Sequence, residues 1–88
     1  MFPSNMDPES YRAYHREQAD MWKRVNANRA SLGLLSFDGV LMEEVEEMLA
    51  EAPGSPEFRA EGIQVSAVAA LIVEAHDRRV AGEQEKAS

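Results

Sequence analysis

The amino-acid sequence predicts an all-α protein made of three helices. No segment alternates polar and apolar residues convincingly with the period of two that a half-buried strand requires. Gly33 and the stretch "APGSP" at residues 52–56 divide the chain into three segments with helical spacing of apolar residues. A chain of 88 residues forms one small domain and buries a modest fraction of its surface. We therefore expect this three-helix unit to assemble into a larger helical bundle by oligomerisation.

The first helix is expected to be long. It begins at "DPES", where Asp7 is the N-cap and Pro8 takes the first helical position. It reaches the region between Asn26 and Ala30, and Gly33 is its C-cap. Residues 1–6, "MFPSNM", are expected to be a flexible lead-in. Residues at helical spacing along this segment are Tyr11, Tyr14, Gln18, Met21, Trp22 and Val25.

The second helix is short and acidic. Ser36 is placed to cap its start, and the proline-rich break ends it near Ala52. Its segment "LMEEVEEMLAE", residues 41–51, contains five glutamates. The side expected to face the core carries Leu41, Val45, Met48 and Leu49.

The five glutamates are not equivalent on this helix. Because residues three and four apart are neighbours, Glu44, Glu47 and Glu51 form a stripe at the edge of the core face. Glu43 and Glu46 point more nearly away from the core, so we expect them to be solvated. A cation between Glu44 and Glu47 would relieve the repulsion between their like charges.

The third helix is apolar on two sides. Ser55 is its expected N-cap, Pro56 its first residue and Val80 its approximate end, which leaves residues 81–88 as a flexible tail. A helix that is apolar on both sides is buried on both sides, so we expect a dimer or tetramer formed through this helix. One side carries Phe58, Val65, Val68, Ile72 and Ala75, and the other carries Ile63, Ala67, Ala70 and Leu71.

Glu61 falls inside the first of these apolar stripes. A carboxylate there needs a cation, a hydrogen-bond donor or a metal, because burial without a partner is costly. An ion pair with an arginine is one alternative. If the second and third helices pack antiparallel, Glu44 and Glu47 face Glu61 and Gln64. Oxygen ligands of this kind suit a hard divalent cation such as Mg²⁺.

Charge and hydropathy exclude several classes of partner. The net charge of −7 is unfavourable for binding the phosphate backbone of nucleic acid. The longest apolar run, "AVAALIV" at residues 67–73, is far shorter than the roughly 20 residues that span a bilayer. The absence of cysteine is compatible with a reducing compartment. We expect a cytoplasmic protein with neither nucleic acid nor a membrane as its partner.

The segment from residue 36 to residue 79 resembles the MazG-like all-α nucleoside triphosphate pyrophosphohydrolases. The signature of that family is EExxE on one helix followed by ExxD on the next. Here "EEVEE" supplies Glu43, Glu44 and Glu47, and "EGIQ" supplies Glu61, with Gln64 where the family usually has aspartate.

The resemblance implies Mg²⁺-dependent hydrolysis of nucleoside or deoxynucleoside triphosphates to the monophosphate and pyrophosphate, with Mn²⁺ as a substitute metal. It implies that Glu44, Glu47 and Glu61 are metal ligands, to which the helix geometry adds Gln64. It also implies catalytic roles for Glu43, Glu44 and Glu47, one of which orients the attacking water. The alternative is a catalytically degenerate or unrelated helical dimer that acts as a protein-interaction module.

Overall fold

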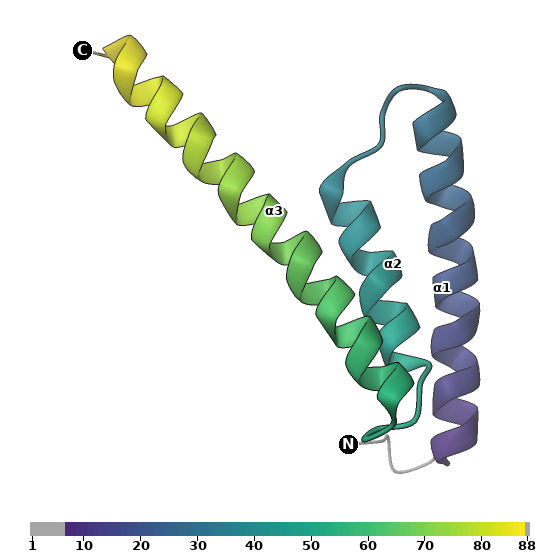
Figure 1. Ribbon diagram of the computed structural model, residues 1–88. Coiled ribbons are helices and arrows are strands. Elements are labelled where there is room, and N and C mark those ends of the chain that lie inside the picture. The colour runs from purple at the N-terminus through teal and green to yellow at the C-terminus, as the bar shows by residue number, and fades with distance from the viewer. Residues whose placement is uncertain (1–6, 88) are drawn as a thin grey trace.

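The computed structural model describes residues 7–87 and is all-helical over that range (Figure 1). The helices are α1 (Pro8–Ser31), α2 (Phe37–Leu49) and α3 (Pro56–Ala87). The range contains no strand, which confirms the predicted fold class. The lead-in expected at residues 1–6 lies outside the described residues.

The ends of α1 follow the sequence prediction closely. The Asp7 side chain accepts a hydrogen bond from the backbone N–H of Ser10 at 2.8 Å, as an N-cap does. At the other end, Leu32 is the capping residue and Gly33 follows it with a φ of 71°. This left-handed conformation favours glycine, which explains why the chain turns here.

The ends of α2 and the start of α3 agree with the sequence prediction only in part. Ser36 is the N-cap of α2 as predicted, but the helix ends at Leu49, before the predicted Ala52. The Ser55 hydroxyl accepts a hydrogen bond from the N–H of Phe58 at 3.1 Å, which caps α3 as expected.

The predicted end of α3 near Val80 is wrong, because the helix continues through Ala87. The segment expected to be a flexible tail, "AGEQEKAS", consists mostly of residues with high helix propensity. In addition, the guanidinium of Arg79 lies 3.3 Å from the Glu83 carboxylate, an i,i+4 pair that supports the helix. Polar composition therefore does not end this helix.

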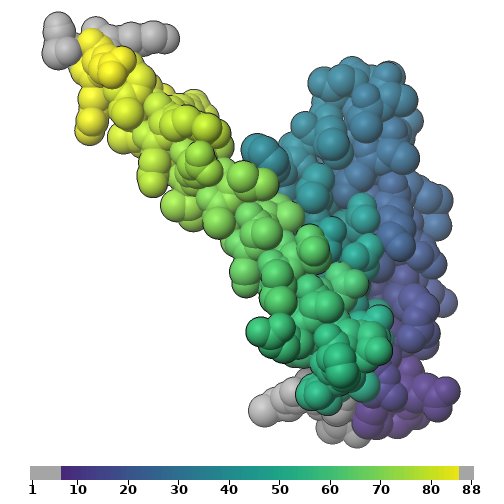
Figure 2. Space-filling view, in the orientation of Figure 1, coloured from purple at the N-terminus to yellow at the C-terminus, as the bar shows by residue number. Residues whose placement is uncertain are grey.

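The middle helix, α2, packs against both α1 and α3 (Figure 1). From its first turn, α3 diverges from the other two helices, so that its C-terminal half projects beyond them, as the space-filling view shows (Figure 2). The molecule is accordingly elongated, with extents of 56 × 29 × 24 Å. None of the helices in the described part of the chain is both long and apolar enough to span a membrane.

The core of a single chain is small. Among residues 7–85, no large side chain is fully buried, and the buried apolar residues are Ala19 and Ala50. The predicted inner stripe of α3 is half-buried, whereas its second apolar side is exposed. The exposed side includes Ile63, Ala67, Ala70 and Leu71.

Asn26 of α1 is buried against the start of α2. Its side-chain Nδ2 donates a hydrogen bond to the backbone carbonyl of Gly39 at 3.0 Å. A Cβ atom added at Gly39 would lie 2.4 Å from Asn26 Oδ1 and 3.0 Å from Arg29 Nη1. Gly39 therefore permits a close approach of α1 and α2 that a larger residue would obstruct.

We expect Gly39→Ala to lower the free energy of unfolding by about 1–3 kcal/mol, because the clash with Asn26 outweighs the better helix propensity of alanine. Gly62→Ala is the matched control, since its Cβ would lie 3.6 Å from Met48 Sδ, an ordinary contact. That variant should be as stable as the wild type or more stable, by up to about 1 kcal/mol. Urea unfolding followed by circular dichroism measures both, and an equal effect of the two substitutions would contradict the proposed close approach.

Candidate functional site

Three glutamates of α2 form a cluster of carboxylates. Glu43, Glu44 and Glu47 each offer one oxygen, and these oxygens all lie within 4.8 Å of one another. All three side chains are partly buried. We call these three residues the acidic cluster. Their spacing along one helix brings them to a common side, as the sequence predicted for Glu44 and Glu47.

Glu61 brings a fourth carboxylate from α3. Burial raises the pKa of Glu44 above its usual value, and the nearby negative charge and hydrogen bond of Glu61 raise it further. Glu61 is partly buried, in keeping with its place in the apolar stripe. The helices α2 and α3 therefore juxtapose the two glutamate motifs across their interface.

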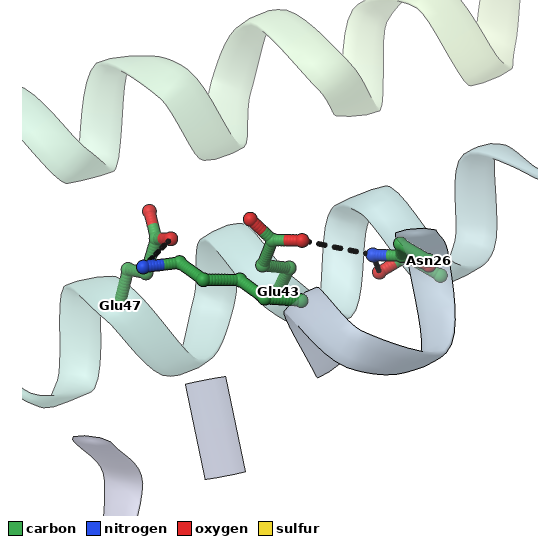
Figure 3. Close-up of polar contacts among 5 residues, drawn as sticks. Asn26, Glu43 and Glu47 are labelled. Atoms are coloured by element: carbon green, nitrogen blue, oxygen red, sulfur yellow. Dashed lines mark hydrogen bonds and ion pairs between the residues drawn. The ribbon is translucent and has the colours of Figure 1, made fainter. Parts of the chain in front are cut away.

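Glu47 is the most strongly perturbed of these carboxylates. Burial, followed by the negative charge of Glu44, raises the pKa of Glu47 to about 6. Lys23 of α1 opposes this shift, and its Nζ lies 3.5 Å from Glu47 Oε1, the ion pair dashed beside Glu47 in Figure 3. One lysine does not offset the negative charge that gathers around this carboxylate.

The expectation that Glu43 and Glu46 are solvated is wrong. Glu43 Oε1 accepts a hydrogen bond from Asn26 Nδ2 at 3.0 Å (Figure 3). Glu46 pairs with His15 of α1 through Nδ1, and the two side chains are only 13% and 12% exposed. The physical reason is that α2 lies between α1 and α3. The sequence prediction assumed one core face on α2, whereas a second side of this helix is also covered.

The His15 ring lies among aromatic side chains of α1. It makes edge-to-face contacts with Tyr11 and Tyr14, whose ring centroids lie 4.4 and 5.1 Å from its own. The aromatic contacts lie within α1, whereas the pair with Glu46 joins the first half of α1 to the C-terminal half of α2. The sequence alone does not indicate the partner of this histidine.

Gln64 is not brought into the cluster in the same way as Glu61. Its side chain is exposed, one turn along α3 from Glu61. Its predicted role as a metal ligand therefore stays a prediction.

A polar cleft lies beside the acidic cluster, where all three helices contribute side chains. Its volume is about 260 Å³. Glu47 belongs to both the cleft and the acidic cluster, so the cleft gives access to one carboxylate of the cluster. The charged side chains that line the cleft are Arg16, Asp20, Lys23, Glu47, Glu51 and Glu61.

The sequence contained signals for the residues that α1 contributes. Arg16, Asp20 and Lys23 are spaced four and three residues apart, which places them on one face of a helix. Asn26 lies four residues after Trp22 and thus on the half-buried side of α1. A polar residue at such a position needs a partner, although its identity does not follow from the sequence.

No protein-family model, curated protein or solved structure matches the chain. The resemblance to the MazG-like family therefore stays a prediction that depends on the two glutamate motifs.

The carboxylates fit a divalent cation by their chemistry. The donors are all oxygen atoms, which hard cations such as Mg²⁺ prefer, and burial followed by the repulsion between the glutamates raises the pKa of Glu44 and Glu47. A bound cation would stabilise the charged forms. The acidic cluster thus has the ligand atoms that a metal needs. The hydrogen bond from Asn26 to Glu43 and the ion pair of Lys23 with Glu47 are also compatible with a purely structural role for these glutamates.

The raised pKa of Glu47 predicts that stability falls as pH rises. The folded pKa of about 6 exceeds the ordinary glutamate value of 4.5, so the folded state binds more protons between these pH values. Stability is therefore greatest below about pH 4.5 for this group, and roughly 1–2 kcal/mol is lost as pH rises through 6. We expect Glu47→Gln to remove most of this loss in urea unfolding measured at several pH values.

Glu17→Gln is the matched control for this experiment, because Glu17 is exposed on α1 and the substitution removes the same charge. It should leave the pH dependence of the wild type almost unchanged. A Glu47→Gln variant with the same pH dependence as the wild type would contradict the perturbation of this carboxylate.

Proposed function

We propose that the protein is a cytoplasmic, Mg²⁺-dependent nucleoside triphosphate pyrophosphohydrolase of the MazG-like type. One observation carries the proposal. The carboxylate oxygens of Glu43, Glu44 and Glu47 gather within 4.8 Å of one another, and Glu61 of the second motif lies beside Glu44. The four glutamates that match the two motifs are therefore close in space, whereas Gln64 of the second motif is exposed.

Glu44, Glu47 and Glu61 would hold the cation. Mg²⁺, when bound, would neutralise the polyphosphate and stabilise the charge that develops on the leaving oxygen. Mn²⁺ is expected to substitute, since it accepts the same ligand atoms. Lys23 would compete with the cation for Glu47, because its Nζ lies 3.5 Å from Glu47 Oε1.

Glu43 is the residue best placed to orient the attacking water. Asn26 Nδ2 donates to one of its oxygens, Oε1, which fixes the carboxylate and leaves Oε2 free to accept a proton from water. Asn26 is buried, and it also donates to the Gly39 carbonyl, so two hydrogen bonds hold its amide in place. Asn26 is accordingly a positioning residue, and Glu43 is the general base.

Measurement of pyrophosphate release from a panel of nucleoside and deoxynucleoside triphosphates tests the proposal. With Mg²⁺, the wild type should release pyrophosphate from at least one of them. Glu47→Gln and Glu61→Gln should lower kcat/KM about 100-fold or more, because each removes a charged ligand of the cation. Glu43→Gln should lower kcat with little change in the Mg²⁺ requirement.

Glu17→Gln removes an exposed carboxylate of α1 and should leave the rate unchanged. Activity that persists in EDTA, or that survives Glu61→Gln, would contradict the metal-dependent mechanism. If no triphosphate in the panel releases pyrophosphate, the enzymatic proposal is wrong.

We also propose that the active assembly is a dimer or tetramer formed through α3. An apolar groove of about 520 Å³ supports this, because Val68 and Leu71 of α3 line it together with residues at the start of α2. The α1–α2 connection adds exposed leucines, of which Leu32 and Leu34 are 63% and 66% exposed. Such a surface is typical of an interface, and a second copy offers the matching apolar side of α3. The groove is completed by Leu35, Ser36, Phe37 and Val40.

This apolar surface also favours the second candidate, a non-enzymatic interaction module. In sedimentation velocity, we expect the wild type to have at least twice the mass of one chain, and Leu71→Glu to shift it toward the monomer. The substitution places a charge on a side chain that is 47% exposed in the single chain and would be buried in the assembly.

Ala13→Glu places the same charge on an exposed position of α1 and should not change the mass. A wild type that is monomeric at high concentration would contradict assembly through α3. An oligomer that releases no pyrophosphate would favour the interaction module.

A further inference from the structure

The polar cleft brings two cationic side chains of α1 together with four carboxylates, one of which, Asp20, also belongs to α1. Arg16 and Lys23 extend from α1, two turns apart on the same face, while Glu47 and Glu61 come from α2 and α3. Its volume of about 260 Å³ is below the roughly 300–1,000 Å³ of pockets that enclose a whole drug-sized ligand. The cleft therefore suits a compact, charged part of a ligand, such as a chain of linked phosphates.

The balance of charge in the cleft sets a condition for binding such an anion. The lining contains two cationic and four acidic side chains, so its net charge is negative. A phosphate group alone would be repelled by this lining. Binding becomes favourable only when a divalent cation neutralises the carboxylates, which leaves Arg16 and Lys23 available to the anion.

Lys23 is the side chain whose surroundings allow it to change partner. Its Nζ lies 3.5 Å from Glu47 Oε1, while its side chain remains 56% exposed and that of Glu47 only 22%. A lysine ammonium on a flexible four-carbon stem can turn toward a new acceptor without movement of the helix. An exposed ion pair of this kind is weak, so a divalent cation can displace the lysine from Glu47.

We propose that Lys23 is an exchangeable counter-ion of the metal site. It pairs with Glu47 when the cleft holds no metal, and it binds a phosphate of the ligand when a divalent cation occupies the carboxylates. Arg16 lines the same cleft and contributes to the same phosphate-binding edge. This inference rests on the proposed function, because it assigns Lys23 a place in the binding of the polyphosphate by that same site.

The exchange predicts effects of opposite sign on two ligands, which a merely structural lysine would not produce. Lys23→Ala removes the competitor of the metal, so Mg²⁺ alone should bind about two- to fivefold more tightly. The same variant should bind inorganic pyrophosphate about tenfold more weakly at saturating Mg²⁺, because a charged donor is lost. Thermal melts with increasing Mg²⁺ measure the first effect, and isothermal titration calorimetry measures the second.

Lys23→Arg keeps the charge and should remain within about threefold of the wild type for both ligands. Arg24→Ala is the matched control, since Arg24 is an exposed neighbour on α1 and lies outside the cleft lining. It should change neither affinity. Pyrophosphate should bind the wild type only when Mg²⁺ is present.

The proposal is overturned if Lys23→Ala leaves both affinities unchanged, or if it weakens Mg²⁺ and pyrophosphate together. A wild type that binds Mg²⁺ and pyrophosphate but hydrolyses no triphosphate contradicts the proposed function, while opposite shifts in Lys23→Ala would still support the exchange. A wild type whose melting temperature does not respond to Mg²⁺ overturns both proposals.

Discussion

The position of an acidic helix between two others is the constraint on which the rest of this structure depends. Because α2 is covered on both sides, its carboxylates are partly removed from water and need partners. α1 supplies a partner to three of them, whereas α3 adds the further negative charge of Glu61. The negative charge of α2 therefore has partners from α1 but not from Glu61 of α3, and the pKa of Glu47 remains raised. The pairs from α1 are His15 with Glu46, Asn26 with Glu43, and Lys23 with Glu47.

Local sequence chemistry was sufficient to predict the number of helices and most of their ends. Asp7, Gly33 and Ser55 act through contacts within a few residues, so their roles follow from short stretches of sequence. The juxtaposition of Glu44 and Glu61 was also predictable, because an antiparallel helix pair with a short connection has few arrangements. The surroundings of Glu43 and Glu46 were not, since they depend on which side of α2 the first helix covers.

The core of a single chain is small, and many of its large apolar side chains lie on the surface. Among residues 7–85, the buried apolar residues are Ala19 and Ala50, both small, while leucines of the α1–α2 connection are exposed. Small residues let helices approach closely, but they contribute little apolar area. Burial of the exposed apolar side chains in an assembly would therefore raise the free energy of unfolding. For this reason, we expect assembly and stability to depend on the same residues.

The order of helix contacts also determines how the site is built during folding. α2 packs against its neighbour on either side in the sequence, so each helix pair closes through the short connection that joins it. Proteins dominated by such local contacts fold rapidly, on the scale of about microseconds to milliseconds. The pairing of α1 with α2, in which Asn26 lies against Gly39, needs no residue after Leu49. Glu61 joins the other carboxylates only through the packing of α3 on α2, so the complete set of four carboxylates depends on the second helix pair as well as the first.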